Sequence, residues 1–272
     1  MILSNGYHHA WGSMVDRCGI PGTGPLYQLR KLRGDGTVNT TQTPRDFMRG
    51  EDPQTFSASW LQGSVDADCN PYLWQPNEKP QLMTFRPAKP NQPRPRWFTS
   101  SWGHGLALFE HGQRFEYPRP KDYWKNDFSI VVECNTANPR TDGNIVWGDP
   151  GLGWITISGF RTNIFALDRR PNNTEYHGPD PAHYTLGLIG HVRVAVIVAH
   201  SSCSIFVNGG CFYQGRINGV SAPDPKATPT WTGITGRSNN LEGECCGGAF
   251  YTRALSPHEA MQITAPSPSC HC

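Results

Sequence analysis

Glycine and proline interrupt this chain so often that long helices have little room to form. The 272 residues include 29 glycines and 24 prolines, about a fifth of the total. Both residue types favour turns, and proline also breaks the interior of a helix. Because the segments between them are short and often apolar, the sequence predicts a fold of many short strands.

From about residue 97 the apolar runs have the character of β-strands. The run HVRVAVIVA at 191–199 places four valines on one face of a strand. Two further runs, 204–207 and 211–216, flank Asn208 and Gly209, the strongest hairpin signal in the chain. About ten such runs favour two antiparallel sheets packed face to face over a parallel α/β fold. The other runs lie at 105–110, 114–117, 127–134, 144–147, 154–158, 163–167, 230–235 and 248–252.

The segment that follows the last strand reads as the start of a helix. Ser256 suits the N-cap, Pro257 the first helical position, and Glu259 completes a capping box. We expect a short helix, stopped by Pro266, that covers the end of a β-sandwich. This segment is a structural device and needs no catalytic role.

Five segments of the chain occur in an order that is typical of one family. They read LALFEHGQRFEYP (106–118), NDFSIVVEC (126–134), HVRVAVIVAHSSCSIFVNGGCFYQG (191–215), ITGRSNN (234–240) and GGAFYTRALSPHEAMQI (247–263). Together they resemble the laminin-G-like, concanavalin A-like jelly-roll domains, and the hairpin and the last segment are the most specific parts. The resemblance covers residues 95–264. It implies an all-β, two-sheet antiparallel jelly-roll sandwich with a binding or assembly role rather than a catalytic one.

The N-terminal part has a different texture. Residues 76–96 contain so many prolines that they cannot form a central strand. We therefore expect residues 1–95 to be an irregular Pro/Gly-rich arm used for docking. Residues 96–272 would then form the sandwich, with the one short helix near its C-terminal end.

Candidate binding residues lie in the predicted loops. The aromatic and amide candidates for glycan contact are Trp147, Trp154, Asn172 and Asn173. Lectins of the family that the chain resembles often bind Ca²⁺ through rim loops, and the corresponding oxygen ligands would be Asp142, Asn144 and Asp149. The alternatives are that the tryptophans pack in the core and that the Asn and Asp residues simply form turns. No other cofactor is expected.

An enzyme is the less favoured class. A retaining glycosidase needs two carboxylates about 5 Å apart, a distance that residues two apart on one face of a strand can meet. The glutamates two residues apart are Glu242 and Glu244, and their Gly-Cys segment reads as a solvated loop. Nucleophile-elbow, zinc-protease and phosphate-loop motifs are absent from the sequence. A carbohydrate-active enzyme therefore stays only as an alternative.

The nine cysteines are odd in number, so at least one cannot pair within the chain. A two-residue turn at Asn208 would pair Cys203 with Gln214 and place Cys203 and Cys211 on opposite sides of the hairpin. Cysteines of the tail, with Cys245 and Cys246, could supply part of a metal site, or could be incidental thiols. If the protein meets oxidising surroundings, the candidates for intersubunit disulfides are Cys18, Cys69, Cys270 and Cys272.

Charge and hydropathy narrow the choice of partners. The net charge is +2 with no long basic run, so no nucleic-acid partner is expected. No apolar stretch is long enough to span a membrane, so no membrane insertion is expected, and the first residues lack the pattern of a secretory signal.

A proline-rich arm is usually disordered unless other parts hold it. We expect neighbouring subunits of a large assembly to hold this arm. Together with the missing secretory signal, this expectation favours a structural protein of a phage or virus particle, made in the host cytoplasm and assembled into the virion. It would be a capsid decoration, collar or fibre component that contacts other subunits as a homo-oligomer. The alternative is a glycan-binding lectin module that contacts a cell-surface glycan and reaches the outside by a non-classical route.

Overall fold

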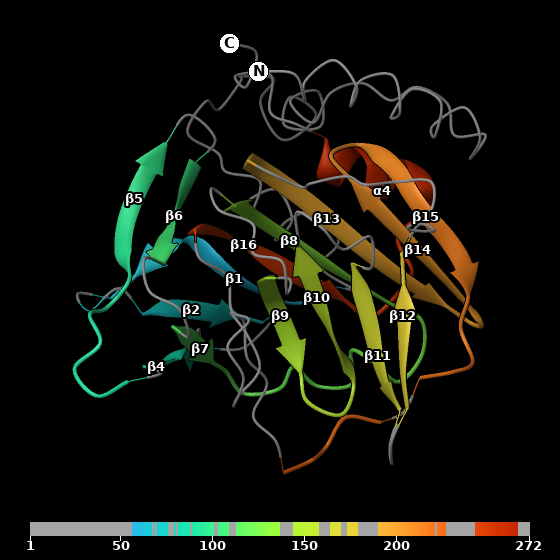
Figure 1. The fold of residues 1–272 in the computed structure, drawn as a ribbon, viewed down its shortest axis with the longest axis horizontal. Helices are drawn as coiled ribbons and strands as arrows, with labels where there is room; N and C mark the ends of the chain where they lie inside the picture. The colour runs from blue at the N-terminus through green and yellow to red at the C-terminus, as the bar shows by residue number, and fades with distance from the viewer. Residues whose placement is uncertain are drawn as a thin grey trace.

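The computed structural model describes most of the chain after residue 55. The described residues are 56–66, 68, 70–75, 79, 81–87, 89–100, 103–108, 113–136, 144–157, 164–169, 173–178, 190–220, 222–226 and 243–265. Within them the chain forms antiparallel sheets and one short helix, which confirms the predicted fold class (Figure 1). In this part of the chain, no helix has both the length and the apolar character needed to cross a membrane.

The larger sheet contains ten strands in the order β15-β14-β13-β8-β16-β1-β2-β3, with β6 paired to β16 and β5 paired to β6. Every described pairing in it is antiparallel. The strands are β1 (Phe56–Val65), β2 (Pro71–Trp74), β3 (Gln81–Leu82), β5 (Arg96–Ser100), β6 (Gly103–Leu108), β8 (Phe128–Thr136), β13 (Gly190–Ala199), β14 (Ser202–Val207), β15 (Gly210–Arg216) and β16 (Gly243–Tyr251).

The smaller sheet has the order β12-β11-β10-β9, and Figure 1 looks through it onto the larger sheet. Its strands are β9 (Asn144–Asp149), β10 (Gly153–Ile157), β11 (Phe165–Arg169) and β12 (Asn173–His177). A two-stranded ribbon of β4 (Thr84–Arg86) and β7 (Arg114–Glu116) lies at the lower left of Figure 1.

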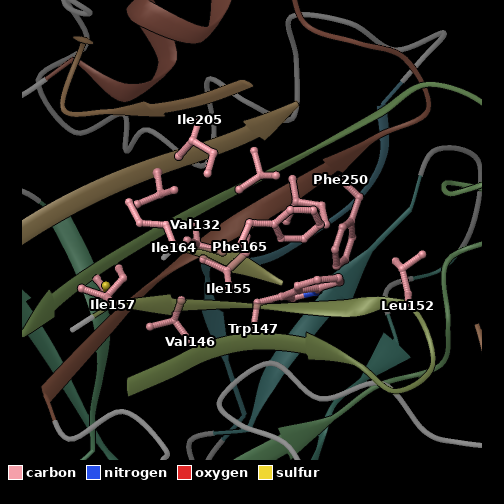
Figure 2. Close-up of a cluster of buried hydrophobic side chains, with 14 of the residues drawn as sticks. Val132, Val146, Trp147, Leu152, Ile155, Ile157, Ile164, Phe165, Ile205 and Phe250 are labelled. Atoms are coloured by element: carbon pink, nitrogen blue, oxygen red, sulfur yellow. The ribbon is translucent and has the colours of Figure 1, made fainter. Parts of the chain in front are cut away.

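The main core fills the space between the two sheets. The valines of β13 alternate as predicted, with Val192, Val194, Val196 and Val198 all buried in it. From the smaller sheet, Ile155 of β10 joins the same cluster (Figure 2). Burial of apolar surface is the main favourable term for folding. Because side chains alternate along a strand, the face that carries the apolar residues is the one that turns inward.

The helix α4 (Pro257–Thr264) begins as the sequence predicts. The Ser256 side chain accepts a hydrogen bond from the Glu259 backbone N–H, and the Glu259 carboxylate accepts one from the Ser256 N–H, which completes the capping box. Its position differs from the expectation. Its apolar residues pack on the face of the larger sheet that is turned away from the smaller sheet, against Ala195 and Ile197 of β13, rather than over the end of the sandwich. Ala195 and Ile197 lie on this second face because side chains alternate along a strand.

The hairpin at Asn208 and Gly209 also forms as predicted. Both residues have positive φ, 48° and 86°, as a type I′ turn requires. Cys203 and Cys211 lie in the two different core clusters, on opposite faces of the sheet, as expected. The predicted partner of Cys203 is wrong, however: a β-bulge after Ile205 shifts the register so that Cys203 faces Gly215.

The expected domain boundary near residue 95 is not where the sandwich begins. Strand β1 pairs with β16, and β2 and β3 extend the sheet beyond β1. The described strands between residues 56 and 86 are therefore part of the larger sheet and the ribbon rather than of an irregular arm. The expectation that residues 76–96 form no central strand agrees with β3, which has two residues and lies at the edge of the sheet. Residues 1–55 lie outside the described residues.

Candidate functional site

The outer face of the smaller sheet carries the most promising surface. Along β10, burial alternates, with Ile155 and Ile157 inward and Trp154 and Thr156 partly exposed. In the strand register, Trp154 lies beside Ala166 of β11. Ala166 in turn lies beside Tyr176 of β12. The row that crosses these three strands therefore presents two aromatic residues on either side of an alanine.

Trp154 and Tyr176 form an aromatic corner. Their ring centroids are 6.4 Å apart and their planes meet at 78°, edge to face. Tyr176 is 52% exposed and, with Leu82, is one of two exposed large apolar side chains among the described residues. Ala166, between them in register, is only 2% exposed. The small side chain of Ala166 leaves room for the rings to approach each other, and the corner that they form is open on the Tyr176 side.

Trp147 does not belong to this surface. It lies beside Ile155 in register, so its indole points inward, and it is 0% exposed. Figure 2 shows it between the sheets near Phe250, and their ring centroids are 5.9 Å apart. Its N–H donates to the Tyr117 hydroxyl at 2.9 Å. The expectation that Trp147 stacks on a sugar is therefore wrong, because a fully buried ring has no face to offer.

Asp149 is also buried and fully engaged. Its two carboxylate oxygens accept hydrogen bonds from Arg119 at 2.6 and 3.0 Å, and Tyr123 donates to one of them at 2.6 Å. Burial raises the pKa of the Tyr123 hydroxyl well above its usual value, and the charge of Asp149 raises it further. The carboxylate thus holds the segment before β8 against the β9–β10 turn. The structure thus gives the Asp149 carboxylate a structural role with Arg119 and Tyr123, and its Ca²⁺ binding stays a prediction of the sequence.

The other candidates are placed only in part. Asn144 begins β9 and Asn173 begins β12, in register with Ile157 and Arg169, and Glu244 lies within β16 rather than in a loop. In the part of the chain that the structure covers, no cluster of three or more His, Cys, Asp or Glu side chains could hold a metal ion. The following predicted residues lie outside the described residues: Asp142, Asn172, Glu242, Cys18, Cys69, Cys270 and Cys272.

A polar cluster that the sequence did not suggest joins the two sheets at one side. His177 of β12 is 2% exposed, and its Nε2 lies 3.3 Å from the Glu175 carboxylate. Its Nδ1 lies 3.5 Å from the Tyr213 hydroxyl of β15. Burial raises the pKa of Tyr213, with smaller contributions from Cys203 and Glu175. The alternation of Glu175 and His177 along β12 could have indicated an inward polar pair, but not its partner on the other sheet.

Comparison with known proteins places the fold. No protein-family model matches the chain, and no curated protein matches it. Among solved structures, it is similar to domain 4 of AbnA, a GH43 extracellular arabinanase from Geobacillus stearothermophilus, in complex with arabinotriose. The TM-score is 0.50 at 14% identity over 67% of this chain and 86% of that one. The fold that these proteins share is a two-sheet antiparallel β-sandwich.

Two toxin domains show the same sandwich. The binding domain of Paraclostridial Mosquitocidal Protein 1 matches at TM-score 0.52 and 12% identity, over 78% of this chain and 52% of that one. The receptor binding domain of botulinum neurotoxin type G matches at 0.53 and 8% identity, over 78% and 51%. The chain thus spans about half the length of each toxin domain. At these identities the likeness concerns the fold.

Proposed function

We propose that this chain is a carbohydrate-binding module and that its ligand packs into the aromatic corner of Trp154 and Tyr176. The observation that carries the proposal is an exposed tyrosine ring set edge to face against a partly exposed tryptophan on the outer face of a sandwich sheet. Aromatic side chains provide apolar faces for the C–H groups of a sugar ring at low conformational cost. A nearby polar group, the half-buried Thr174 that precedes Tyr176 by two positions on the same face, can hydrogen-bond a sugar hydroxyl.

The angle between the rings favours one class of carbohydrate. The two planes meet at 78°, so they do not form the flat surface that would suit the face of a crystalline polysaccharide. Such a corner accommodates one sugar ring against one aromatic face, and the next sugar of the chain then points away from the two aromatic rings. The proposal therefore specifies a short oligosaccharide or a chain end. A precedent for a sugar ligand on this fold is the arabinanase domain solved with arabinotriose.

The test is a glycan array, with and without Ca²⁺, followed by titration calorimetry with the best oligosaccharide. We expect binding that chelation of Ca²⁺ leaves unchanged, because Arg119 and Tyr123 occupy the carboxylate of Asp149. Binding to crystalline cellulose should be no stronger than that of a control protein. An array without hits under both conditions would exclude the proposal.

The role in a virus particle stays a prediction of the sequence. Its docking arm was expected over residues 1–95, of which residues 1–55 lie outside the described residues. The same holds for the homo-oligomer, for virion or extracellular location, and for the absence of catalysis. Electron microscopy of native material would test the assembly, and it is independent of the glycan experiment.

A further inference from the structure

A second surface of the molecule has an unusual charge. The sequence from 79 to 96 contains five Lys or Arg residues and no Asp or Glu, although the whole chain carries a net charge of only +2. We call residues 86–96, the part that runs from β4 to the start of β5, the basic strap. Its exposed cations are Arg86, Lys89, Arg94 and Arg96. In Figure 1 it runs along the left side of the molecule from β4 up to β5.

The basic strap is fixed to the body of the protein by specific contacts. The Gln113 side-chain amide donates to the Pro93 carbonyl, and Pro95 is buried. The Arg94 guanidinium donates to the Asn70 side chain at 2.8 Å and lies 5.2 Å from the centre of the Phe85 ring. The cations are therefore displayed on an ordered segment, which lowers the entropy cost of binding a ligand.

At the start of the basic strap, Arg86 shares a single carboxylate with Arg114, an arginine outside the strap. Arg86 of β4 and Arg114 of β7 are direct register partners across the ribbon. Glu116 accepts from Arg86 at 2.9 Å with one oxygen and from Arg114 at 3.4 Å with the other. The side chain of Arg86 is 54% exposed, whereas that of Glu116 is 13% exposed. Two guanidinium groups on one carboxylate leave an excess positive charge, and the exposed arginine presents it to solvent.

At the other end of the basic strap, the acidic group Asp66 interacts with Arg94 rather than with Arg86. Asp66 accepts hydrogen bonds from the backbone of Asp68 and from the backbone and side chain of Asn70. Those bonds, together with the charge of Arg94, lower the pKa of Asp66 although burial acts to raise it. The carboxylate of Asp66 thus stabilises its own turn and offsets part of the charge of Arg94. Among the described contacts, Glu116 is the one carboxylate that pairs with Arg86 and Arg114, so the excess positive charge lies at these two arginines.

We propose that the basic strap, with Arg86 and Arg114, binds the sulfate or carboxylate groups of an acidic polysaccharide. A guanidinium group matches the two oxygens of such an anion with two parallel hydrogen bonds. A short cluster of cations suits charges spaced along sugar units. A short cluster of cations suits duplex DNA less well, because duplex DNA carries one charge per about 1.7 Å of its axis and needs an extended basic surface. The choice of a glycan as carrier of the charge rests on the proposed function.

The experiment measures binding of the full chain to dextran sulfate, polygalacturonate and uncharged dextran of similar length. Dextran sulfate separates a preference for sulfate from one for the carboxylate of polygalacturonate. We expect binding to at least one of the two acidic polymers, none to dextran, and loss of affinity as salt rises from 50 to 300 mM, a range chosen to shorten the roughly 10 Å screening length.

Three variants test the assignment to these residues. Arg86→Gln should weaken binding roughly threefold or more, as expected for an exposed ionic contact, and Arg86→Lys should restore part of it. Glu116→Gln should strengthen binding, because it releases two guanidinium groups from their carboxylate. Arg216→Gln is the matched control, since it removes one exposed positive charge at the end of β15, on the opposite edge of the larger sheet. It should change affinity little.

The outcomes separate this inference from the proposed function. Trp154→Ala should weaken oligosaccharide binding at the aromatic corner and leave dextran sulfate binding intact. The inference is overturned if Arg86→Gln behaves like Arg216→Gln, if Glu116→Gln weakens binding while its melting temperature is unchanged, or if duplex DNA binds as tightly as either polysaccharide at 150 mM salt, a value near physiological ionic strength.

Discussion

Trp147 and Trp154 lie on the two arms of one β-hairpin and face opposite sides of its sheet. Trp147 lies beside Ile155 and is fully buried, whereas Trp154 lies beside Gly148 and faces outward. The turn between them sets this difference, because the register that it imposes decides which side chains share a face. One tryptophan therefore serves stability, and the other is available to a ligand.

Replacing each tryptophan by alanine should separate these two roles. Trp147→Ala removes a buried indole and should lower the free energy of unfolding by about 3–5 kcal/mol. Trp154→Ala should cost about 1 kcal/mol, because its side chain is only partly buried. Urea denaturation followed by circular dichroism measures both. Similar losses in the two variants would contradict the assignment of Trp147 to the core.

The buried ion pair between Glu133 and Arg193 should be costly to break. Arg193 donates to Glu133 at 3.0 Å and to the Ala265 carbonyl beyond α4, and both charged side chains are 2% exposed or less. Glu133→Gln should lower the free energy of unfolding by about 3–5 kcal/mol, because it leaves a buried guanidinium without its countercharge. Replacing both, as Glu133→Leu with Arg193→Met, should cost less than the single change. A single variant as stable as wild type in urea would refute this prediction.

Local signals in the sequence predicted local structure well. The Asn208-Gly209 turn and the Ser256 cap are each specified by neighbouring residues, and both form as expected. The bulge after Ile205 shifts the partner of Cys203 by one residue, and no residue nearby announces it. Register errors of this kind arise because a bulge depends on how two strands pack, not on one strand alone.

Long-range pairing explains what the sequence did not reveal. Strand β1 was missed because its partner, β16, follows it by almost the whole length of the sandwich. Strand β12 was missed because two of its inward residues are Glu175 and His177, which are polar and break the expected alternation. The aromatic corner could not be predicted, since the proximity of Tyr176 to Trp154 depends on the register of three strands.

The contact between Glu259 and Arg253 should make α4 sensitive to acid. Arg253 donates to the carboxylate at 2.6 and 2.9 Å, and this interaction, with the capping hydrogen bonds, lowers the pKa of Glu259. A carboxyl group with a lowered folded-state pKa stabilises the protein above its unfolded-state pKa, about 4.3. That contribution is lost as the pH falls through the folded-state value. The loss should be less than about 1 kcal/mol, because the pair is partly exposed.

The measurement is the free energy of unfolding between pH 7 and pH 3, compared between wild type and Glu259→Gln. Glu259→Gln should be less stable at pH 7 and should converge with wild type at low pH. Ser256→Ala is the control for the cap, with an expected loss of about 1 kcal/mol at both pH values. A constant difference between wild type and Glu259→Gln across the whole range would contradict the ionic explanation.

The thiols of Cys134 and Cys203 should resist alkylation in the folded protein. Both are buried, and burial raises their pKa above the ordinary value, with a further contribution from the charge of Glu133 or Glu175. Because the thiolate is the reactive form, iodoacetamide at pH 8 should leave both unmodified in the native state and modify both in guanidinium chloride. Peptide mass spectrometry distinguishes these two sites from the other cysteines. Equal modification in the two states would show that the core is accessible.

The most direct test of the central claim is oligosaccharide binding by variants of the aromatic corner. Calorimetry with the best glycan should give wild-type affinity for Tyr176→Phe, which keeps the ring, and a loss of about fivefold or more for Tyr176→Ala, as for removal of a stacking contact worth about 1–3 kcal/mol. Trp154→Ala should give a similar loss, with each variant folded by circular dichroism. If the folded alanine variants bind the glycan as tightly as wild type, the ligand does not bind at Trp154 and Tyr176, and the account of this face is wrong.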